Sequence, residues 1–343
     1  MFKWIRNILE KKAVETKALN IILGVSVFLI LILSIEFGTR SLVYFVHGPS
    51  VAKTIWLLKY EPYLSYTAIN PSKIGKEFPP KDDKYRILIL GGSTAIQIPL
   101  DIVKEKFQEI TNRKVEVFNF ADGGYIFSQN LVSFVLYGIK LNPDLVISLD
   151  GANDMVFITK KMPPGVNEQS VYIKRSVERP FLNAFLCLFN KSMFVKSLFK
   201  LNERKNEVLL QKDKKIFNKM ITYYIQSINS VAAIAKGCEA EYICVLQPYL
   251  YLRKTITEEE KDLHNPYFYR DEYLKNGFKR LDNVLSKEVF PSYVYYVSAL
   301  DAFNNSDETC FWDNLHLNRK GNEILIDYII KKAQEKGFYL NDQ

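Results

Sequence analysis

The sequence predicts an α/β protein built on a parallel sheet. Three observations predict this class: short β-branched apolar runs recur along the chain, stretches with helical periodicity alternate with them, and polar motifs directly follow several of the apolar runs. Parallel strands joined by crossover helices place their ligand crevice at the carboxyl ends of the strands. The expected strands are Arg86 to Leu90, Val115 to Phe118, Leu145 to Leu149, Tyr242 to Leu246 and Tyr293 to Val297. The expected helices are about Ser128 to Lys140, Lys214 to Lys236, Asp271 to Lys287 and Asn318 to Lys336.

An apolar run precedes this domain. The chain has 343 residues and a formal net charge of +8, and no residue from Ala18 to Ile35 is charged. As a helix this run measures about 27 Å, close to the thickness of a hydrocarbon core. Basic residues outnumber acidic ones before the run, which predicts a cytoplasmic segment 1–17, a single-pass anchor 18–36 in the cytoplasmic membrane and an extracytoplasmic remainder. The basic residues are Lys3, Arg6, Lys11, Lys12 and Lys17, against Glu10 and Glu15.

Two other interpretations of the run are weaker. A cleaved signal peptide would have a shorter apolar region and small residues at the cleavage site, but Glu36 to Arg40 (EFGTR) does not fit. A buried core helix would show a polar face, and the run has none. After the anchor, residues 37–80 are expected to form a stalk and entry segment rich in turn-forming residues. Residues 81–343 are expected to form one domain with a helical insertion at about 160–215.

The first polar motif, Gly91-Gly92-Ser93-Thr94, follows the first predicted strand. Two glycines let the backbone turn sharply and leave room beside the serine, which resembles a nucleophile elbow, although the string is not G-x-S-x-G. A plain strand-to-helix turn with Ser93 as the N-cap remains the alternative for this motif alone. A phosphate-binding loop is excluded because no G-K-[ST] string follows.

Two further motifs follow the next strands. Asn119 to Tyr125 (NFADGGY) would bring the Gly124 amide to the crevice, although paired glycines after a strand also form simple turns. Gly151-Ala152-Asn153-Asp154 follows the most apolar strand, and the Asn153 side chain has an N–H able to stabilise an oxyanion. An Asx-turn would explain Asn153 equally well. Asp150 and Asp154 flank this asparagine, but two carboxylates without a third ligand do not predict a metal site.

The last motif contains the candidate base. A serine hydrolase needs an imidazole near its nucleophile, and of the three histidines His47 lies beside the predicted membrane and His264 in a charged connector. His316 remains, three residues after Asp313 and two before Asn318, a predicted N-cap. In such a turn the Asp313 carboxylate can reach Nδ1–H of His316 and leave Nε2 free as a base. A surface Asp and His in a loop is the alternative.

The remaining features point to no separate chemistry. The insertion is basic and aromatic, at Tyr172 to Arg175 and Phe194 to Leu201, and is interpreted as a packed helix pair, a lid or a face that lies on anionic lipid. Lys174, Arg175, Lys196 and Lys200 would carry the lipid contact. Nucleic acid is not an expected partner. The four cysteines lack C-x-x-C spacing, so zinc is not predicted, and of their pairings Cys238 with Cys244 is one possibility. They are Cys187, Cys238, Cys244 and Cys310.

Taken together, the four motifs resemble the SGNH/GDSL hydrolase superfamily, in block order and in strand context, over about Tyr85 to Ala333. The resemblance implies a flavodoxin-like three-layer α/β/α sandwich, with Ser93 as nucleophile, His316 as base and Asp313 orienting it. The amides of Ser93 and Gly124 and the Asn153 side chain would form the oxyanion hole. No cofactor and no metal are implied. Two positions depart from the family: Gly92 replaces an acidic residue, and Gln97 stands where glycine is common.

The chain also resembles a membrane-anchored bacterial subgroup, through G-G-S-T and the string Leu246 to Leu250 (LQPYL). That resemblance implies an esterase acting on an O-acyl group of a cell-envelope carbohydrate, with envelope polysaccharide assembly proteins as possible partners. An O-acyltransferase using the same acyl-enzyme is the first alternative. A catalytically silent glycan-binding or scaffolding protein is the second.

Overall fold

The structure is a computed structural model that describes residues 19–31, 33–34, 63–64, 80–156, 165–167, 214–263 and 271–338. The chain divides into two units, Met1–Leu58 and Lys59–Gln343. In the first unit residues 19–31 and 33–34 are helical, and their large apolar side chains, such as Leu23 and Phe28, are exposed. No helix within the described ranges has both the length and the apolar character needed to cross a bilayer. The predicted anchor 18–36 lies partly outside the described residues, as does most of the stalk 37–80.

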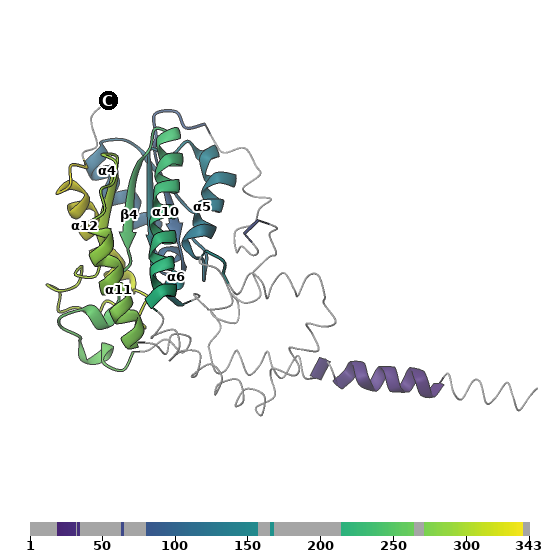
Figure 1. The fold of residues 1–343 in the computed structure, drawn as a ribbon. Coiled ribbons are helices and arrows are strands. Elements are labelled where there is room, and N and C mark those ends of the chain that lie inside the picture. Colours follow the sequence, from purple (N-terminus) through teal and green to yellow (C-terminus); the bar gives the residue numbers. More distant parts are fainter. Residues whose placement is uncertain are drawn as a thin grey trace, which may run out of the picture. The chain divides into compact units, whose positions relative to one another are not determined.

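A parallel sheet of five strands, of which β4 is labelled in Figure 1, forms the centre of the second unit. The strand order is β2-β1-β3-β4-β5. This is the strand order of flavodoxin-like sheets. β1, β3, β4 and β5 are buried on both faces, which is why they appear in the sequence as nearly continuous apolar runs, whereas the edge strand β2 is only partly buried. They are β1 (Tyr85–Gly91), β2 (Val115–Asn119), β3 (Leu145–Asp150), β4 (Glu241–Leu246) and β5 (Val294–Ser298).

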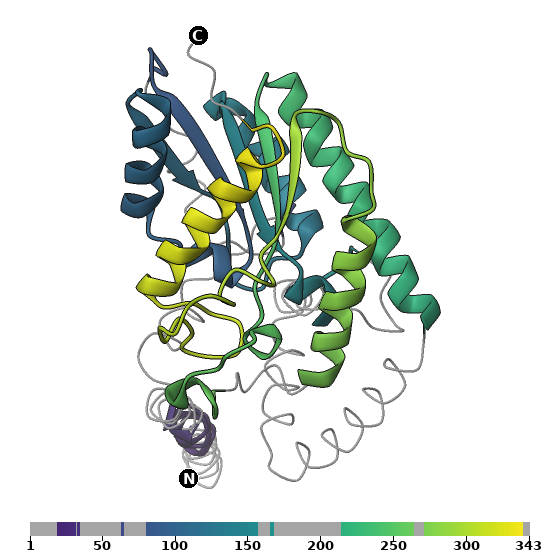
Figure 2. The same cartoon turned by 90° about the vertical axis from the view of Figure 1, so that its left-hand side faces the viewer.

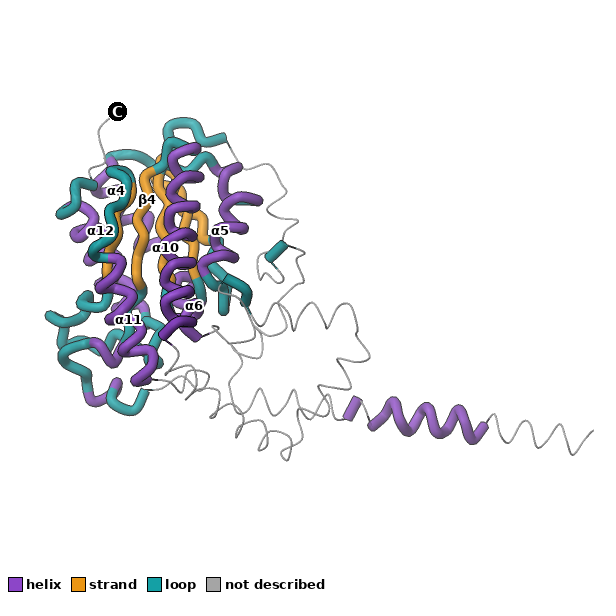
Figure 3. The backbone as a smooth tube through the Cα atoms, in the orientation of Figure 1, coloured by secondary structure: helices purple, strands orange, loops and turns teal. Residues whose placement is uncertain are grey.

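Helices cover both faces of this sheet and make three layers (Figure 3). On one face α4 (Leu100–Thr111) and α12 (Arg319–Gln334) pack against each other, and α12 crosses in front of the strands in Figure 2. The opposite face is covered by α5 (Phe127–Leu136), α10 (Lys214–Gly237) and α11 (Asp271–Leu285). The described fold is therefore the three-layer α/β/α sandwich that the sequence predicts.

Alternate residues of each strand build two separate cores. Leu88, Val146 and Cys244 face the α5, α10 and α11 layer, whereas Ile89 and Ile147 face the α4 and α12 layer. This division follows from the period of two along a strand. Three of the polar motifs directly follow β1, β2 and β3 in the sequence, so they lie at the carboxyl ends of these strands, where the chain leaves the sheet.

Most predicted boundaries are shifted by one or two residues, the short helices α3 (Ser93–Ile96) and α6 (Ala152–Val156) were not predicted, and two larger differences stand out. Helix α4 was not predicted, although the crossover from β1 to β2 needs such an element. The predicted helix 128–140 is two elements: α5 ends at Leu136, and a 3-10 turn, Gly138–Leu141, follows. The chain packs closely at the break, since a Cβ on Gly138 would lie 2.6 Å from the side chains of Leu88 and Phe134.

Candidate active site

Ser93 stands at the carboxyl end of β1, as the first residue of the short helix α3 (Ser93–Ile96). The turn before it requires both glycines. A Cβ on Gly91 would lie 2.5 Å from the Leu149 carbonyl oxygen, and a Cβ on Gly92 would lie 2.5 Å from Asn153 Nδ2. The Asn153 amide occupies the space that a side chain at position 92 would need.

His316 lies in a tight loop between the last strand and α12. Phe311 and Leu317 form an antiparallel bridge, and the Trp312 amide donates to the His316 carbonyl at 3.1 Å. Beyond the loop, the Asn318 side chain accepts a hydrogen bond from the Gly321 amide at 2.8 Å and caps α12, as the sequence predicts. The loop is thus fixed on both sides of the imidazole.

The Asp313 carboxylate orients this imidazole. Its Oδ1 accepts from the amides of Leu315 and His316 at 2.8 and 2.7 Å, and its Oδ2 lies 2.6 Å from Nδ1 of His316. Burial alone would raise the pKa of Asp313, but the hydrogen bonds from His316 and the two amides hold that pKa below its usual value. Asp313 is thereby kept ionised next to Nδ1–H.

The other nitrogen of the imidazole faces the serine. Nε2 of His316 lies 2.7 Å from Ser93 Oγ, although the two residues are 223 positions apart in the chain. With Nδ1–H donating to the carboxylate, Nε2 is the acceptor for the serine hydroxyl; the protonation follows from the hydrogen-bond network. The structure therefore brings the three predicted residues Ser93, His316 and Asp313 into one hydrogen-bonded chain.

The candidate oxyanion donors lie around the same turn. Asn153, in α6 (Ala152–Val156), donates from Nδ2 to the Tyr125 carbonyl at 2.8 Å, which uses one of its two amide hydrogens. Gly124 adjoins Tyr125 in the left-handed conformation, with φ of +77°. The Ser93 amide is at the first position of α3, where no intrahelical acceptor is available. Asn153 adjoins the serine turn directly, and Gly124 is connected to it through Tyr125.

Two buried carboxyl groups, those of Asp150 and Asp154, flank Asn153 in the sequence. Burial raises the pKa of Asp154 to about 7, although the Phe127 amide donates to its carboxylate. Burial and the nearby Asp154 charge raise the pKa of Asp150 well above its usual value. Asn130 donates to Asp150 Oδ1 at 2.7 Å and accepts from the Gly91 amide at 3.1 Å, which ties this pair to the serine turn.

Sequence reasoning missed several residues that support the site. Asn167 donates to the Gly124 carbonyl at 2.9 Å and to Gln129 at 2.8 Å. Gln97 accepts a hydrogen bond at 3.2 Å from the indole N–H of Trp312. Trp312 could have been predicted as a site residue because it directly precedes Asp313. Asn167 could not, because it stands outside every motif.

The other predicted features are placed as follows. Cys238, Cys244 and Cys310 are free thiols, so the suggested pairing of Cys238 with Cys244 is absent. Among the described residues, no group of three or more His, Cys, Asp or Glu side chains is arranged to hold a metal. The four candidate lipid contacts of the predicted insertion lie outside the described residues. His47, His264 and Cys187 lie outside them as well.

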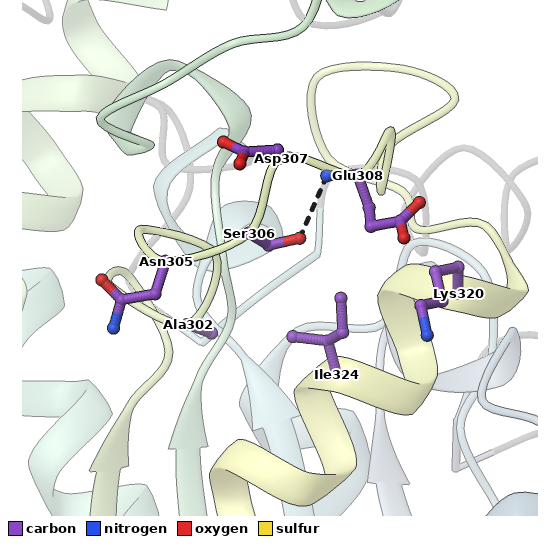
Figure 4. A pocket seen from close by; sticks show the side chains of 7 residues that line it. All are labelled: Ala302, Asn305, Ser306, Asp307, Glu308, Lys320 and Ile324. Carbon is purple, nitrogen blue, oxygen red and sulfur yellow. Dashed lines mark hydrogen bonds between the residues drawn. The ribbon is translucent and has the colours of Figure 1, made fainter.

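A surface hollow lies away from these residues, between the loop after β5 and the first turns of α12 (Figure 4). It contains neither Ser93 nor His316, and its carboxylates and single lysine suggest no catalytic arrangement. Its lining residues are Ala302, Asn305, Ser306, Asp307, Glu308, Lys320 and Ile324.

No protein-family model matches this chain, and neither does any curated protein sequence. Among solved structures it is similar to a lipase from a goat rumen metagenome, with 15% identity and a TM-score of 0.43 over 74% of this chain and 98% of that chain. It is also similar to an acetylxylan esterase of Geobacillus stearothermophilus, with 14% identity and a TM-score of 0.40 over 76% and 97% of the two chains. For an alpha/beta hydrolase from the metagenome of Lake Arreo, Spain, the identity is 13% and the TM-score 0.39, over 78% and 100%. At such low identities and TM-scores, the activity has to be argued from the geometry of the site.

Proposed function

We propose that this protein is a serine ester hydrolase of the SGNH/GDSL type. The observation that carries the proposal is the continuous contact from Ser93 Oγ to His316 Nε2 at 2.7 Å and from His316 Nδ1 to Asp313 at 2.6 Å. A serine hydroxyl is a weak nucleophile until an adjacent base takes its proton, and the base needs a third group to hold its tautomer. Ser93, His316 and Asp313 lie within hydrogen-bond reach in this order, which supports the assignment of the three roles to them.

The first half of the reaction forms an acyl-enzyme. His316 Nε2 takes the proton of Ser93 as Oγ attacks the ester carbonyl carbon. The amides of Ser93 and Gly124 and the Asn153 side chain would hold the oxyanion of the tetrahedral intermediate. The proton on Nε2 then passes to the leaving alcohol oxygen as its bond to the carbonyl carbon breaks, and the acyl group stays on Ser93.

The second half releases the acyl group. Water gives a proton to His316 Nε2 as its oxygen attacks the acyl-serine carbonyl carbon. His316 Nε2 then passes this proton to Ser93 Oγ as the bond between Oγ and the acyl carbon breaks. The products are a carboxylic acid and free enzyme. If a sugar hydroxyl replaces water as the acceptor, the same site works as an O-acyltransferase.

For the substrate we propose an O-acyl group on a cell-envelope carbohydrate, because the chain resembles membrane-anchored bacterial proteins of this type. The proposal includes an anchor at 18–36, a catalytic domain outside the cytoplasm and contacts with envelope polysaccharide assembly proteins. An anchor predicts that the full chain stays in the membrane pellet after alkaline carbonate extraction, whereas a chain beginning at Lys59 does not. Release of the full chain by carbonate would contradict the anchor.

The activity is tested with the full chain in detergent and p-nitrophenyl acetate as substrate, beside an O-acetylated glycan. We expect acetate release that the Ser93→Ala variant loses. Adding free sugar as an acceptor distinguishes hydrolysis from transfer, because transfer yields an acylated sugar in place of acetate. A silent glycan-binding protein would release nothing from either ester, and equal turnover by Ser93→Ala would refute the assignment.

A further inference from the structure

Gln247 directly follows β4, which supplies none of the proposed catalytic residues. Gln247 is buried, with 4% of its surface exposed. Its backbone N–H donates to the Asp150 carbonyl at 2.9 Å, which extends the pairing of β3 with β4. Gln247 Oε1 accepts from the Ala152 amide at 3.3 Å. Its Nε2 donates to Thr94 Oγ1 at 3.2 Å.

The hydrogen bonds continue beyond Thr94. The Thr94 hydroxyl donates to the Leu315 carbonyl at 3.4 Å, and Thr94 is also buried. A carbonyl oxygen can only accept, so the hydroxyl has to donate to Leu315 and accept from Gln247. The direction of every bond from Gln247 to Leu315 is thereby fixed.

Each contact of this network adjoins a different part of the proposed machinery. Thr94 follows the nucleophile Ser93, Ala152 precedes Asn153, and Leu315 precedes the base His316. The network therefore joins three segments that are far apart in the chain, the start of α3, the start of α6 and the loop before α12, each next to a proposed catalytic residue.

We propose that Gln247 is a positioning residue that, together with Thr94, sets the spacing between the nucleophile, the Asn153 donor and the imidazole. The inference rests on the proposed function. Catalytic groups have to stay close to their productive geometry, and a misplacement of 1 Å can lower the rate by about 10². Bonds of 3.2–3.4 Å lie at the long end for hydrogen bonds, so we expect their loss to lower the free energy of unfolding only slightly.

Two near-isosteric substitutions interrupt the network without a large change in volume. Gln247→Glu puts an acceptor where Nε2 donates, so the Thr94 hydroxyl turns toward the carboxylate and Leu315 loses its donor. Thr94→Val removes the hydroxyl, and Thr94→Ser restores it. Thr111→Val is the matched control, since Thr111 is a buried threonine whose hydroxyl donates to Phe107 at 2.7 Å at the far end of α4.

The experiment measures kcat and KM of the full chain with p-nitrophenyl acetate, together with thermal unfolding. We expect Gln247→Glu and Thr94→Val each to lower kcat about 10- to 100-fold with KM within about twofold. The double variant should be no slower than the slower single variant, because both interrupt one network. Thr94→Ser should recover most of kcat, and Thr111→Val should lower the unfolding temperature with little effect on kcat.

The proposal is overturned if kcat of Thr94→Val stays within about twofold of the unmodified chain, or if Thr94→Ser is as slow as Thr94→Val. Additive losses in the double variant would also overturn it. If Gln247→Glu does not fold, the Thr94 pair decides the question alone. Failure of the proposed function itself is a different result: the unmodified chain then shows no turnover, or Ser93→Ala turns over as fast as it does.

Discussion

The indole ring of Trp312 lies flat against the imidazole of His316, with ring centroids 5.0 Å apart and an angle of 15° between the planes. The indole N–H is held by Gln97, four residues after the proposed nucleophile. Trp312 is itself 52% exposed, so one aromatic side chain covers a face of the proposed base and also borders solvent. This contact restricts rotation of the imidazole.

We expect Trp312→Leu to lower kcat about 10-fold, because the imidazole loses the ring that limits its motion while Asp313 still holds Nδ1. Trp312→Phe keeps an aromatic face without the N–H, so its kcat should lie between those of Trp312→Leu and the unmodified chain. Steady-state kinetics with p-nitrophenyl acetate gives the comparison. Equal kcat in the leucine variant and the unmodified chain would show that the stack does not contribute to catalysis.

Asn153→Ala should lower kcat by about 10²–10³, the usual effect of removing one oxyanion donor. The chain should remain folded, since alanine is compatible with the short helix α6 and the acceptor that the Asn153 side chain leaves is a single carbonyl, that of Tyr125. Kinetics alongside circular dichroism checks both statements. A folded variant with kcat within threefold of the unmodified chain would remove Asn153 from the proposed oxyanion hole.

Asp154 should make the protein less stable as the pH rises. Its pKa is about 7 in the folded chain and 3.8 in a free aspartate, so between these values the folded state holds a proton that the unfolded chain has released. Stability is therefore lost from about pH 4 up to about pH 7, at roughly 1.4 kcal/mol for each pH unit at most. Asp150, whose pKa shifts in the same direction, adds to this slope.

The variant Asp154→Asn tests this dependence by urea unfolding at pH 5 and pH 8. Its side-chain oxygen can still accept from the Phe127 amide, while the charge is gone. We expect the variant to gain more stability at pH 8 than at pH 5. An equal gain at both values would mean that Asp154 does not titrate in this range.

Removing the charge of Glu260 should lower the free energy of unfolding by more than most single substitutions. It is fully buried, pairs with Arg253 at 2.6 Å, and accepts from the amides of Cys310 and Phe311 just before the His316 loop. Removing one partner of a buried ion pair costs about 3–5 kcal/mol because the other charge stays buried. Urea unfolding of Glu260→Gln should show a loss of this size, and a loss below about 1 kcal/mol would contradict the prediction. Lys261→Gln, next to it and exposed, is the control.

The sequence was sufficient to predict the sheet because strands buried on both faces stand out as runs such as Arg86 to Leu90 (RILIL). Helix α4 escaped prediction because its charged residues interrupt a short apolar stripe of Ile102, Val103 and Phe107. The end of α5 at Leu136 was missed for another reason: it depends on how closely Gly138 packs against Leu88, a contact that forms only in the folded chain.

Local patterns in the sequence were sufficient to suggest Ser93, Asp313 and His316 as site residues. Ser93 follows a strand, and Asp313 precedes His316 by three residues. The contact between Ser93 and His316 could not be derived locally because it spans 223 positions. Gln247 stands in the LQPYL string, but nothing in that string indicates which segments its side chain joins, and Asn167 stands outside every motif. The importance of both residues comes from hydrogen bonds that form only in the folded chain.

The activation of Ser93 by His316 is tested most directly by fluorophosphonate labelling of the full chain, followed by intact mass and peptide mapping. Only an activated serine reacts readily with this probe. We predict a single adduct on Ser93, none in Ser93→Ala, and labelling at least about 10²-fold slower in His316→Ala. An unlabelled but folded chain, or an adduct on another serine, would contradict the account.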